Sequence, residues 1–482
     1  MYDIPPMPTF PDSETQIRTE TNALRRRMLE GTWGPDLERY LQAQIDLSRR
    51  ATWGTIDQSS NVFAHSCKAL AVLYSEKPLI GVPKQYRNEA EPYLKTDGAL
   101  DRSNYFSIMQ SVQYKTIGIR EMFVRVDISN SGELLYRPVT PDMIYAKSPA
   151  GDPLKPNCIY EYRLRQNEKT GDMFWTADIY DIRDKSFPKY QVRLVDADGT
   201  LGEDVSEMFL GGNMDGPNYP YIDSRGMAYL PWVVYHADLT GKLFNSNALS
   251  SVEMGSLQAS TYYCFLKHLF LDSAWPQRYT VNAGLAGLNT YGTGQADQRQ
   301  SIPADPASIL CFMPDPDVQS QPMLGQFEAG LKDPNQMISA ITVYERRLAS
   351  MMGIDAASVT KISSDPRSGY SIAMSQSAMR DTQRRFSETF RYSDSLALTM
   401  GAKISNRFLG TKYPEDSIYS IQYIAVPLSP DELKAQREDI IQKMEKGLLS
   451  HTEAIMELYD LTEEEAIEKL RTIRKQKIEF GT

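Results

Sequence analysis

Cysteine and histidine are scarce in this chain of 482 residues, which contains four of each. The cysteines lack the close paired spacing of a zinc site or a redox motif, so we expect reduced, mostly buried thiols. They are Cys67, Cys158, Cys264 and Cys311. The histidines are solitary, so we predict no metal site. They are His65, His236, His268 and His451.

Long apolar runs and an excess of basic residues are also absent. No run approaches the ~18 residues of a membrane span, and the first residues lack the basic region and apolar core of a signal peptide. We therefore expect a soluble protein that is made in a cytoplasm, is not secreted and has no membrane partner. The 52 lysines and arginines are outnumbered by 62 acidic residues, which gives a net charge of -10. This sign excludes a broad basic face for nucleic acid, so contact with DNA must be local or transient.

Motifs of catalysis and cofactor binding are missing too. There is no phosphate-binding glycine loop, no dinucleotide fingerprint and no nucleophile elbow. The segment Tyr291-Gly-Thr-Gly294 reads as a turn, and Asp315 and Asp317 stand between prolines as loop carboxylates. We predict that the protein binds no cofactor and is not an enzyme.

The sequence does contain a clear succession of helical and strand-like segments. Residues 14–74 are helical in pattern, with breaks near Gly31 and Gly54. From Ser111 to His236, short β-branched and aromatic runs alternate with turn residues, which predicts a largely antiparallel sheet. The expected fold class is therefore α+β.

Two long helices follow, separated by a polar segment. The first is predicted at 247–271 and is stopped by Trp275-Pro276. A small module with short strands is expected within 276–326, and the second helix begins with Asp333 as cap and Pro334 at its first position. Four apolar residues of this helix form a seam that packs against helices or subunits. They are Met337, Ile341, Tyr344 and Leu348.

A glycine-flanked loop is predicted at 353–369, because its small, polar and β-branched residues do not propagate a helix. A helix of nearly forty residues follows at 370–408, and we expect its charged face, which includes Arg384 and Asp394, to be solvated. A strand is expected at 420–426. Capping boxes begin at Ser429, Ser450 and Thr462 and predict an ordered helical C-terminus.

This order of elements resembles the portal proteins of tailed bacteriophages. Four short segments of the sequence also resemble this family. They are Gly241-Lys-Leu-Phe-Asn-Ser-Asn-Ala-Leu-Ser-Ser251, Leu348-Ala-Ser-Met-Met-Gly-Ile354, Gly447-Leu-Leu-Ser-His-Thr-Glu-Ala454 and Leu461-Thr-Glu-Glu-Glu-Ala466. The resemblance implies the following division of the chain. The wing is 1–246 with 409–428 returning to it, the stem helices are 247–271 and 332–352, the clip is 272–331, the tunnel loop is 353–369, the long wing and channel helix is 370–408 and the crown is 429–482.

The same resemblance implies a function. Portal subunits form a homo-dodecameric ring at a unique capsid vertex of the virion, through which double-stranded DNA is packaged and ejected without sequence specificity. Their partners are the major capsid protein and scaffold, the terminase large subunit and then the head-tail adaptor.

The tunnel loop of a portal lies at the channel constriction, so Lys361 and Arg367 are the expected DNA contacts, assisted by Ser363, Ser364 and Ser368. The two cations could instead be solvated or form ion pairs between subunits. Two other functions stay open: another ring-forming virion connector or adaptor, and a cytoplasmic enzyme whose site the motifs do not reveal.

Overall fold

The structure is a computed structural model. It describes residues 8, 13–44, 56–167, 171–212, 214–245, 249–274, 278–281, 283–285, 312–314, 323–326, 334–354, 369–416, 418–424, 430–459, 466–467 and 469–472.

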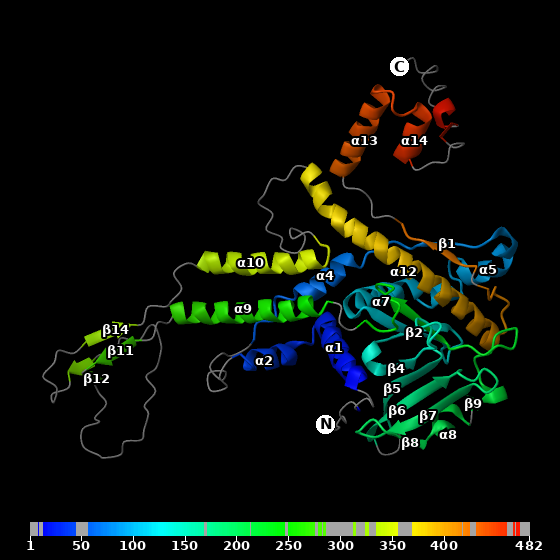
Figure 1. The fold of residues 1–482 in the computed structure, drawn as a ribbon, viewed down its shortest axis with the longest axis horizontal. Coiled ribbons are helices and arrows are strands. Elements are labelled where there is room, and N and C mark those ends of the chain that lie inside the picture. The colour runs from blue at the N-terminus through cyan, green and yellow to red at the C-terminus, as the bar shows by residue number, and fades with distance from the viewer. Residues whose placement is uncertain are drawn as a thin grey trace.

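Helices and strands are mixed along the chain, in agreement with the predicted α+β class (Figure 1). The helices are α1 (Ser13–Glu30), α2 (Gly34–Gln42), α4 (Val62–Leu70), α5 (Arg87–Leu94), α6 (Ala99–Arg102), α7 (Tyr105–Ile119), α8 (Ser206–Leu210), α9 (Ser250–Ala274), α10 (Pro334–Met351), α12 (Gly369–Leu409), α13 (Pro430–Glu445) and α14 (His451–Tyr459). The strands are β1 (Leu79–Gly81), β2 (Glu121–Ile128), β3 (Leu134–Val139), β4 (Ile144–Lys147), β5 (Cys158–Gln166), β6 (Met173–Asp181), β7 (Lys189–Val195), β8 (Leu201–Asp204), β9 (Met214–Asp215), β10 (Trp232–His236), β11 (Arg278–Val281), β12 (Ala283–Leu285), β13 (Phe312–Pro314), β14 (Met323–Gln326) and β15 (Ser420–Gln422).

Two antiparallel sheets build the α/β body, in agreement with the prediction of hairpins. One has the order β10-β2-β3, and the other has the order β4-β5-β6-β7-β8 with β9 paired to β7. The prediction that strands begin at Ser111 was wrong, because residues 105–119 form α7. The buried side of α7 packs on β2 and β3, and this burial outweighs the weak helix propensity of its β-branched residues.

A buried ionic network joins the two sheets. The Arg125 guanidinium of β2 lies 3.5 Å from the Glu161 carboxylate and 3.9 Å from that of Asp178, on β5 and β6. Arg137 also pairs with Glu161, and Arg165 donates to Asp178 at 2.7 Å. Because Glu161 and Asp178 are buried, each needs these cations to offset the loss of hydration.

Asp394 of α12 is the meeting point of four distant segments. Its carboxylate is fully buried and accepts hydrogen bonds of 2.6 to 2.8 Å from four tyrosine hydroxyls. The donors are Tyr74 after α4, Tyr105 of α7, Tyr235 of β10 and Tyr423 after β15. The expectation that Asp394 is solvated was therefore wrong, whereas Arg384 and Arg385 on the same helix are exposed as expected.

The helices α9 and α10 lie side by side and project from the body, and the short strands β11, β12 and β14 lie beyond their far ends (Figure 1). In this region β11 pairs with β14 and β12 with β13, both antiparallel. Short strands were expected within 276–326, and β11 at Arg278–Val281 is one of them. The first long helix runs to Ala274, three residues past its predicted end and up to the residue before Trp275-Pro276.

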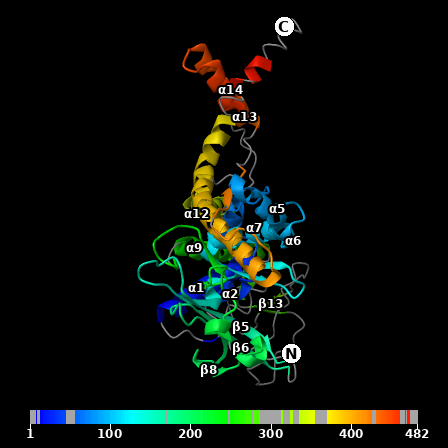
Figure 2. The same cartoon turned by 90° about the vertical axis from the view of Figure 1, so that its right-hand side faces the viewer.

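The long helix α12 crosses the body, and α13 and α14 lie at its end away from the two sheets (Figures 1 and 2). After α12 the chain returns to the body, where β15 pairs with β1. The predicted capping box is present, since Ser450 N–H donates to Glu453 at 2.8 Å and Glu453 N–H donates to the Ser450 hydroxyl at 3.2 Å. Gly447 ends α13 with a positive φ of 70°, which favours glycine. Ser429 and Thr462 lie outside the described residues.

Replacing Asp394 with asparagine should lower the free energy of unfolding by about 2 to 4 kcal/mol, because one amide oxygen cannot accept from four buried hydroxyls. Urea unfolding of both proteins measures the difference. Glu388→Gln is the matched control, since the Glu388 side chain is 70% exposed on the same helix, and its effect should stay within about 0.5 kcal/mol. Equal effects of the two substitutions would show that the hydroxyl cluster does not stabilise the body.

Candidate assembly and channel surfaces

The seam between α9 and α10 depends on one glycine. A Cβ atom at Gly255 of α9 would overlap the Leu348 side chain and come within 3.2 Å of the Tyr344 hydroxyl. Glycine therefore lets the two backbones approach closely at this point. Farther along the pair, the Tyr262 and Tyr344 rings meet edge to face with centroids 5.9 Å apart.

The four seam residues predicted from the sequence do not share one environment. Ile341 and Leu348 are 6% and 4% exposed, and Tyr344 packs partly against the core. Met337 is 37% exposed in the single chain. The structure therefore places two of the four firmly in the interior and one at the surface, and their role between subunits stays a prediction.

Buried charges fix the root of this helical hairpin to the body. Arg25 of α1 forms an ion pair with Glu253 of α9, and these side chains are 0% and 5% exposed. On α10, the Glu345 carboxylate accepts from the Ser60 hydroxyl at 2.5 Å and from the Tyr263 hydroxyl at 3.3 Å. Both helices are thus tied to the N-terminal segments, and Glu345 also ties them to each other.

Glu121 of β2 is a third buried carboxylate at this root. It accepts from the backbone N–H of Asn245, just before α9, at 3.2 Å and from the Asn22 side chain at 3.5 Å. Burial raises the pKa of Glu121 to about 7, against the lowering effects of these hydrogen bonds and of Arg18 and Arg25.

Sequence reasoning missed these carboxylates. Glu345 had a detectable signal, because it lies four residues after Ile341 and three before Leu348, which places an acid inside the apolar seam. For Glu121 and Glu253, the partners are far away in the sequence, and no local pattern distinguishes the two from surface acids.

Large apolar side chains are exposed along both helices of the hairpin. On α9 they are Met254, Tyr262 and Phe270, and on α10 they are Met337, Ile338, Val343 and Met351, with exposed fractions from 37% to 63%. Their spacings place them on more than one side of the helices. In the single chain, both helices therefore present large apolar side chains to solvent.

The predicted DNA-contact residues all lie outside the described residues. They are Lys361, Arg367, Ser363, Ser364 and Ser368, in the segment that joins Ile354 to α12. Ile354 itself is buried at 2% exposure. The exposed charges on the described part of α12 are partly paired, as Arg391 with Glu388 at 3.1 Å and Arg385 with Asp238 at 3.4 Å.

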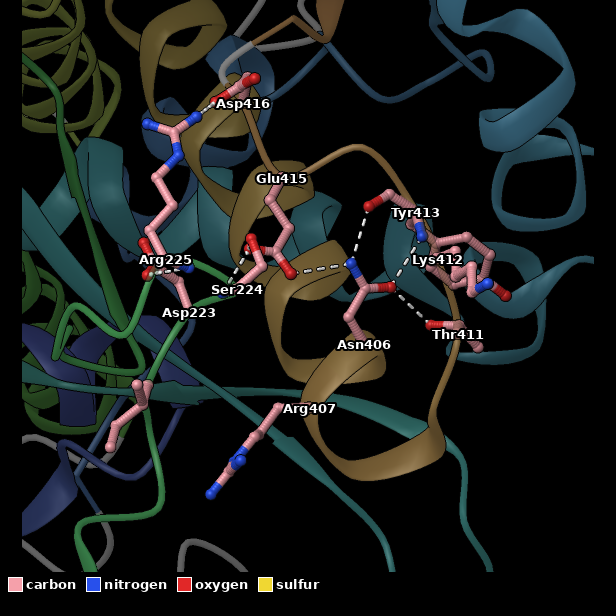
Figure 3. A pocket seen from close by; sticks show the side chains of 11 residues that line it. Asp223, Ser224, Arg225, Asn406, Arg407, Thr411, Lys412, Tyr413, Glu415 and Asp416 are labelled. Carbon is pink, nitrogen blue, oxygen red and sulfur yellow. Dashed lines mark hydrogen bonds and ion pairs between the residues drawn. The ribbon is translucent and has the colours of Figure 1, made fainter. Parts of the chain in front are cut away.

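A polar pocket of about 520 Å³ lies where α12 ends, against the turn at 222–225 (Figure 3). Glu415 accepts from the Ser224 hydroxyl at 2.7 Å and from the Asn406 amide at 2.9 Å, and Arg225 pairs with Asp416. Burial raises the pKa of Glu415, but the hydrogen bonds from Asn406 and Ser224 outweigh it and leave the pKa lowered. A carboxylate of low pKa is a poor general base, so the pocket holds two segments together and offers little for catalysis.

Comparisons with models of protein families and with curated proteins find no match for this chain. No helix in the described part of the chain is long and apolar enough to cross a membrane. Within the same residues, no group of three or more His, Cys, Asp or Glu side chains is placed to hold a metal ion. Cys67, Cys158 and Cys264 are buried, and Cys311 lies outside the described residues.

Stability should depend on pH through Glu121. Because folding raises its pKa from an ordinary 4.5 to about 7, its contribution is present in full below pH 4.5 and is lost as the pH rises through 7. The shift corresponds to a change on the order of 3 kcal/mol across this window. The free energy of unfolding is measured in urea at each pH for the parent chain and for Glu121→Gln, and the difference between the two isolates the effect of Glu121. The exposed Glu89→Gln is the control. Parallel curves for Glu121→Gln and the parent would contradict the assignment.

Proposed function

We propose that this chain is the portal subunit of a tailed bacteriophage. In this function, copies of the chain form a dodecameric ring at one capsid vertex and enclose a channel for double-stranded DNA. The ring docks the terminase during packaging and the head-tail adaptor afterwards, and it contacts the capsid protein and scaffold.

One observation carries this proposal: a pair of long helices projects from an α/β body, bears small strands at its far end and is followed by the 41-residue helix α12 (Figure 1). The order matches the wing, stem, clip and long helix implied by the sequence resemblance. The position of α13 and α14 beyond α12 suits a crown.

The exposed apolar residues of the hairpin support assembly into a ring. A cyclic ring places a neighbour on two sides of each subunit and uses two different surfaces for the contacts. The exposed residues of α9 and α10 are spread around the hairpin, as such an arrangement requires.

The charge of the chain supports a sliding channel. Every phosphate neutralised by lysine or arginine strengthens DNA binding through counterion release, so a basic lining would hold the duplex. A subunit with a net charge of -10 avoids this, and a few cations such as Lys361 and Arg367 can contact the backbone briefly.

Ring assembly should fail when the exposed apolar surface of α10 receives a charge. Val343 is 63% exposed, so Val343→Asp should leave the folded subunit intact and weaken self-association by about tenfold or more. Electron microscopy of the purified proteins, with rotational symmetry counted in class averages, measures the outcome. The control is Gln110→Asp, an exposed polar position on α7 of the body.

Rings of about twelve subunits around a hole wide enough for a duplex are expected for the parent chain and the control. A parent chain that stays monomeric at high concentration would overturn the portal proposal and favour the enzyme alternative.

The loop cations should act on DNA and not on assembly. Replacing Lys361 and Arg367 together with alanine should leave the rings intact and reduce the DNA packaged or retained per head. Quantifying DNA in purified heads measures this effect. Normal DNA content in heads that contain the variant would remove the role assigned to the loop.

A further inference from the structure

β10 is an outer strand of the three-stranded sheet, since in the described part of the chain it pairs only with β2. The N–H of Ala237, next to β10, donates to the Arg120 carbonyl at 2.8 Å. Hydrogen-bonded pairs alternate along an antiparallel ladder. The backbone groups of Trp232, Val234 and His236 therefore point away from β2. The hydrogen bonding of Val234 is consistent with this alternation, because the Ser393 hydroxyl of α12 donates to the Val234 carbonyl at 3.0 Å.

A groove of about 680 Å³ runs along this open edge. Leu396 and Met400 of α12 line it, together with Pro156 before β5 and Ile182 after β6. The groove also exposes three large apolar side chains. These are Met227, Leu239 and Tyr392, with exposed fractions of 55%, 57% and 50%.

The charges at the rim of the groove are largely neutralised in pairs. The pairs are Lys155 with Asp152 at 3.3 Å, Lys403 with Asp223 at 3.2 Å, and Arg225 with Asp416. Only Lys185 of the lining cations stands exposed without an ion pair among the described residues. Apart from Lys185 and the hydrogen-bonded carboxylate of Glu415, the rim offers a charged occupant no unpaired counter-charge, so it favours an uncharged segment.

Trp232 of β10 is one of the residues that line the groove. The residue is 6% exposed, and its indole N–H has no hydrogen-bond partner among the described residues. A buried N–H without a partner costs free energy, so Trp232 is an unsatisfied donor next to the groove.

We propose that this groove binds an extended segment of a partner protein, which adds to β10 as another strand. The Val234 carbonyl already accepts from Ser393, so the Val234 N–H and the outward backbone groups of Trp232 and His236 would supply the hydrogen bonds. The apolar side chains of the groove would select apolar side chains at alternate positions. The bound stretch carries no charge. This inference rests on β10 and α12 alone and stands whether or not the chain forms a portal ring.

The test uses a fluorescent heptapeptide of alternating valine and threonine, blocked at both ends, and the purified full chain. Fluorescence anisotropy should show saturable binding. The same peptide N-methylated at every residue should not bind, because it keeps the side chains and lacks the backbone donors.

Two variants test the two parts of the groove. Tyr392→Asp places a charge on an exposed wall position, and Val234→Pro removes an N–H that faces away from β2. Each should weaken peptide binding by about tenfold or more, and each should unfold at a temperature close to that of the parent. Ile424→Asp, at a position 42% exposed outside the groove lining, is the matched control and should bind normally.

Three results would overturn the proposal. They are no binding of the alternating peptide at about 1 mM, binding that survives both groove substitutions in folded proteins, and equal binding of the N-methylated peptide. Hydrogen exchange provides an additional check on the occupant. If the amides of Trp232, Val234 and His236 become protected when the chain assembles without peptide, the occupant is a second copy and the partner-protein assignment is wrong.

Discussion

Four tyrosine hydroxyls converge on the Asp394 carboxylate, and the closure of the α/β body depends on this convergence. The donors come from the segment after α4, from α7, from β10 and from the segment after β15. Burial raises the pKa of Asp394, and the four hydrogen bonds oppose this effect by stabilising the ionised form. A single side chain of α12 thereby sets where that helix lies relative to both the N-terminal helices and the first sheet.

The position of α12 then determines what the rest of the body presents. Its inner face covers the sheet that contains β10, and its flank forms one wall of the groove beside the β10 edge. Its end carries Asn406, which accepts from Thr411 and from the N–H of Tyr413 and so turns the chain back toward β15. The hairpin of α9 and α10 is held separately, through the buried carboxylates Glu253 and Glu345, so the molecule has two anchored parts that meet around α4.

The sequence predicted the elements better than their contacts. Three features were predictable because proline geometry and helix capping act within a few residues. They are helix α10, the end of α9 before Trp275-Pro276 and the capping box at Ser450. Asp394 was misjudged because its neighbours Arg391 and Ser395 suggest a solvated face, while its four partners are as many as 320 residues away. Helix α7 was misjudged because β-branched composition favours strands locally, and only packing on β2 and β3 decides otherwise. The apolar seam was visible, but which of its residues face inward depends on Gly255, whose importance appears only when both helices are placed.

The pairing of β1 with β15 also has a consequence for synthesis on the ribosome. β1 (Leu79–Gly81) is synthesised long before its partner β15 (Ser420–Gln422) emerges from the ribosome. Contacts this distant along the chain are slow to form and cannot form during most of translation. The hairpin of α9 and α10 is therefore complete while the body that supports it is still open. Exposed apolar residues on that hairpin can contact neighbouring chains before the body closes. Nascent chains on one messenger RNA are therefore prone to associate prematurely.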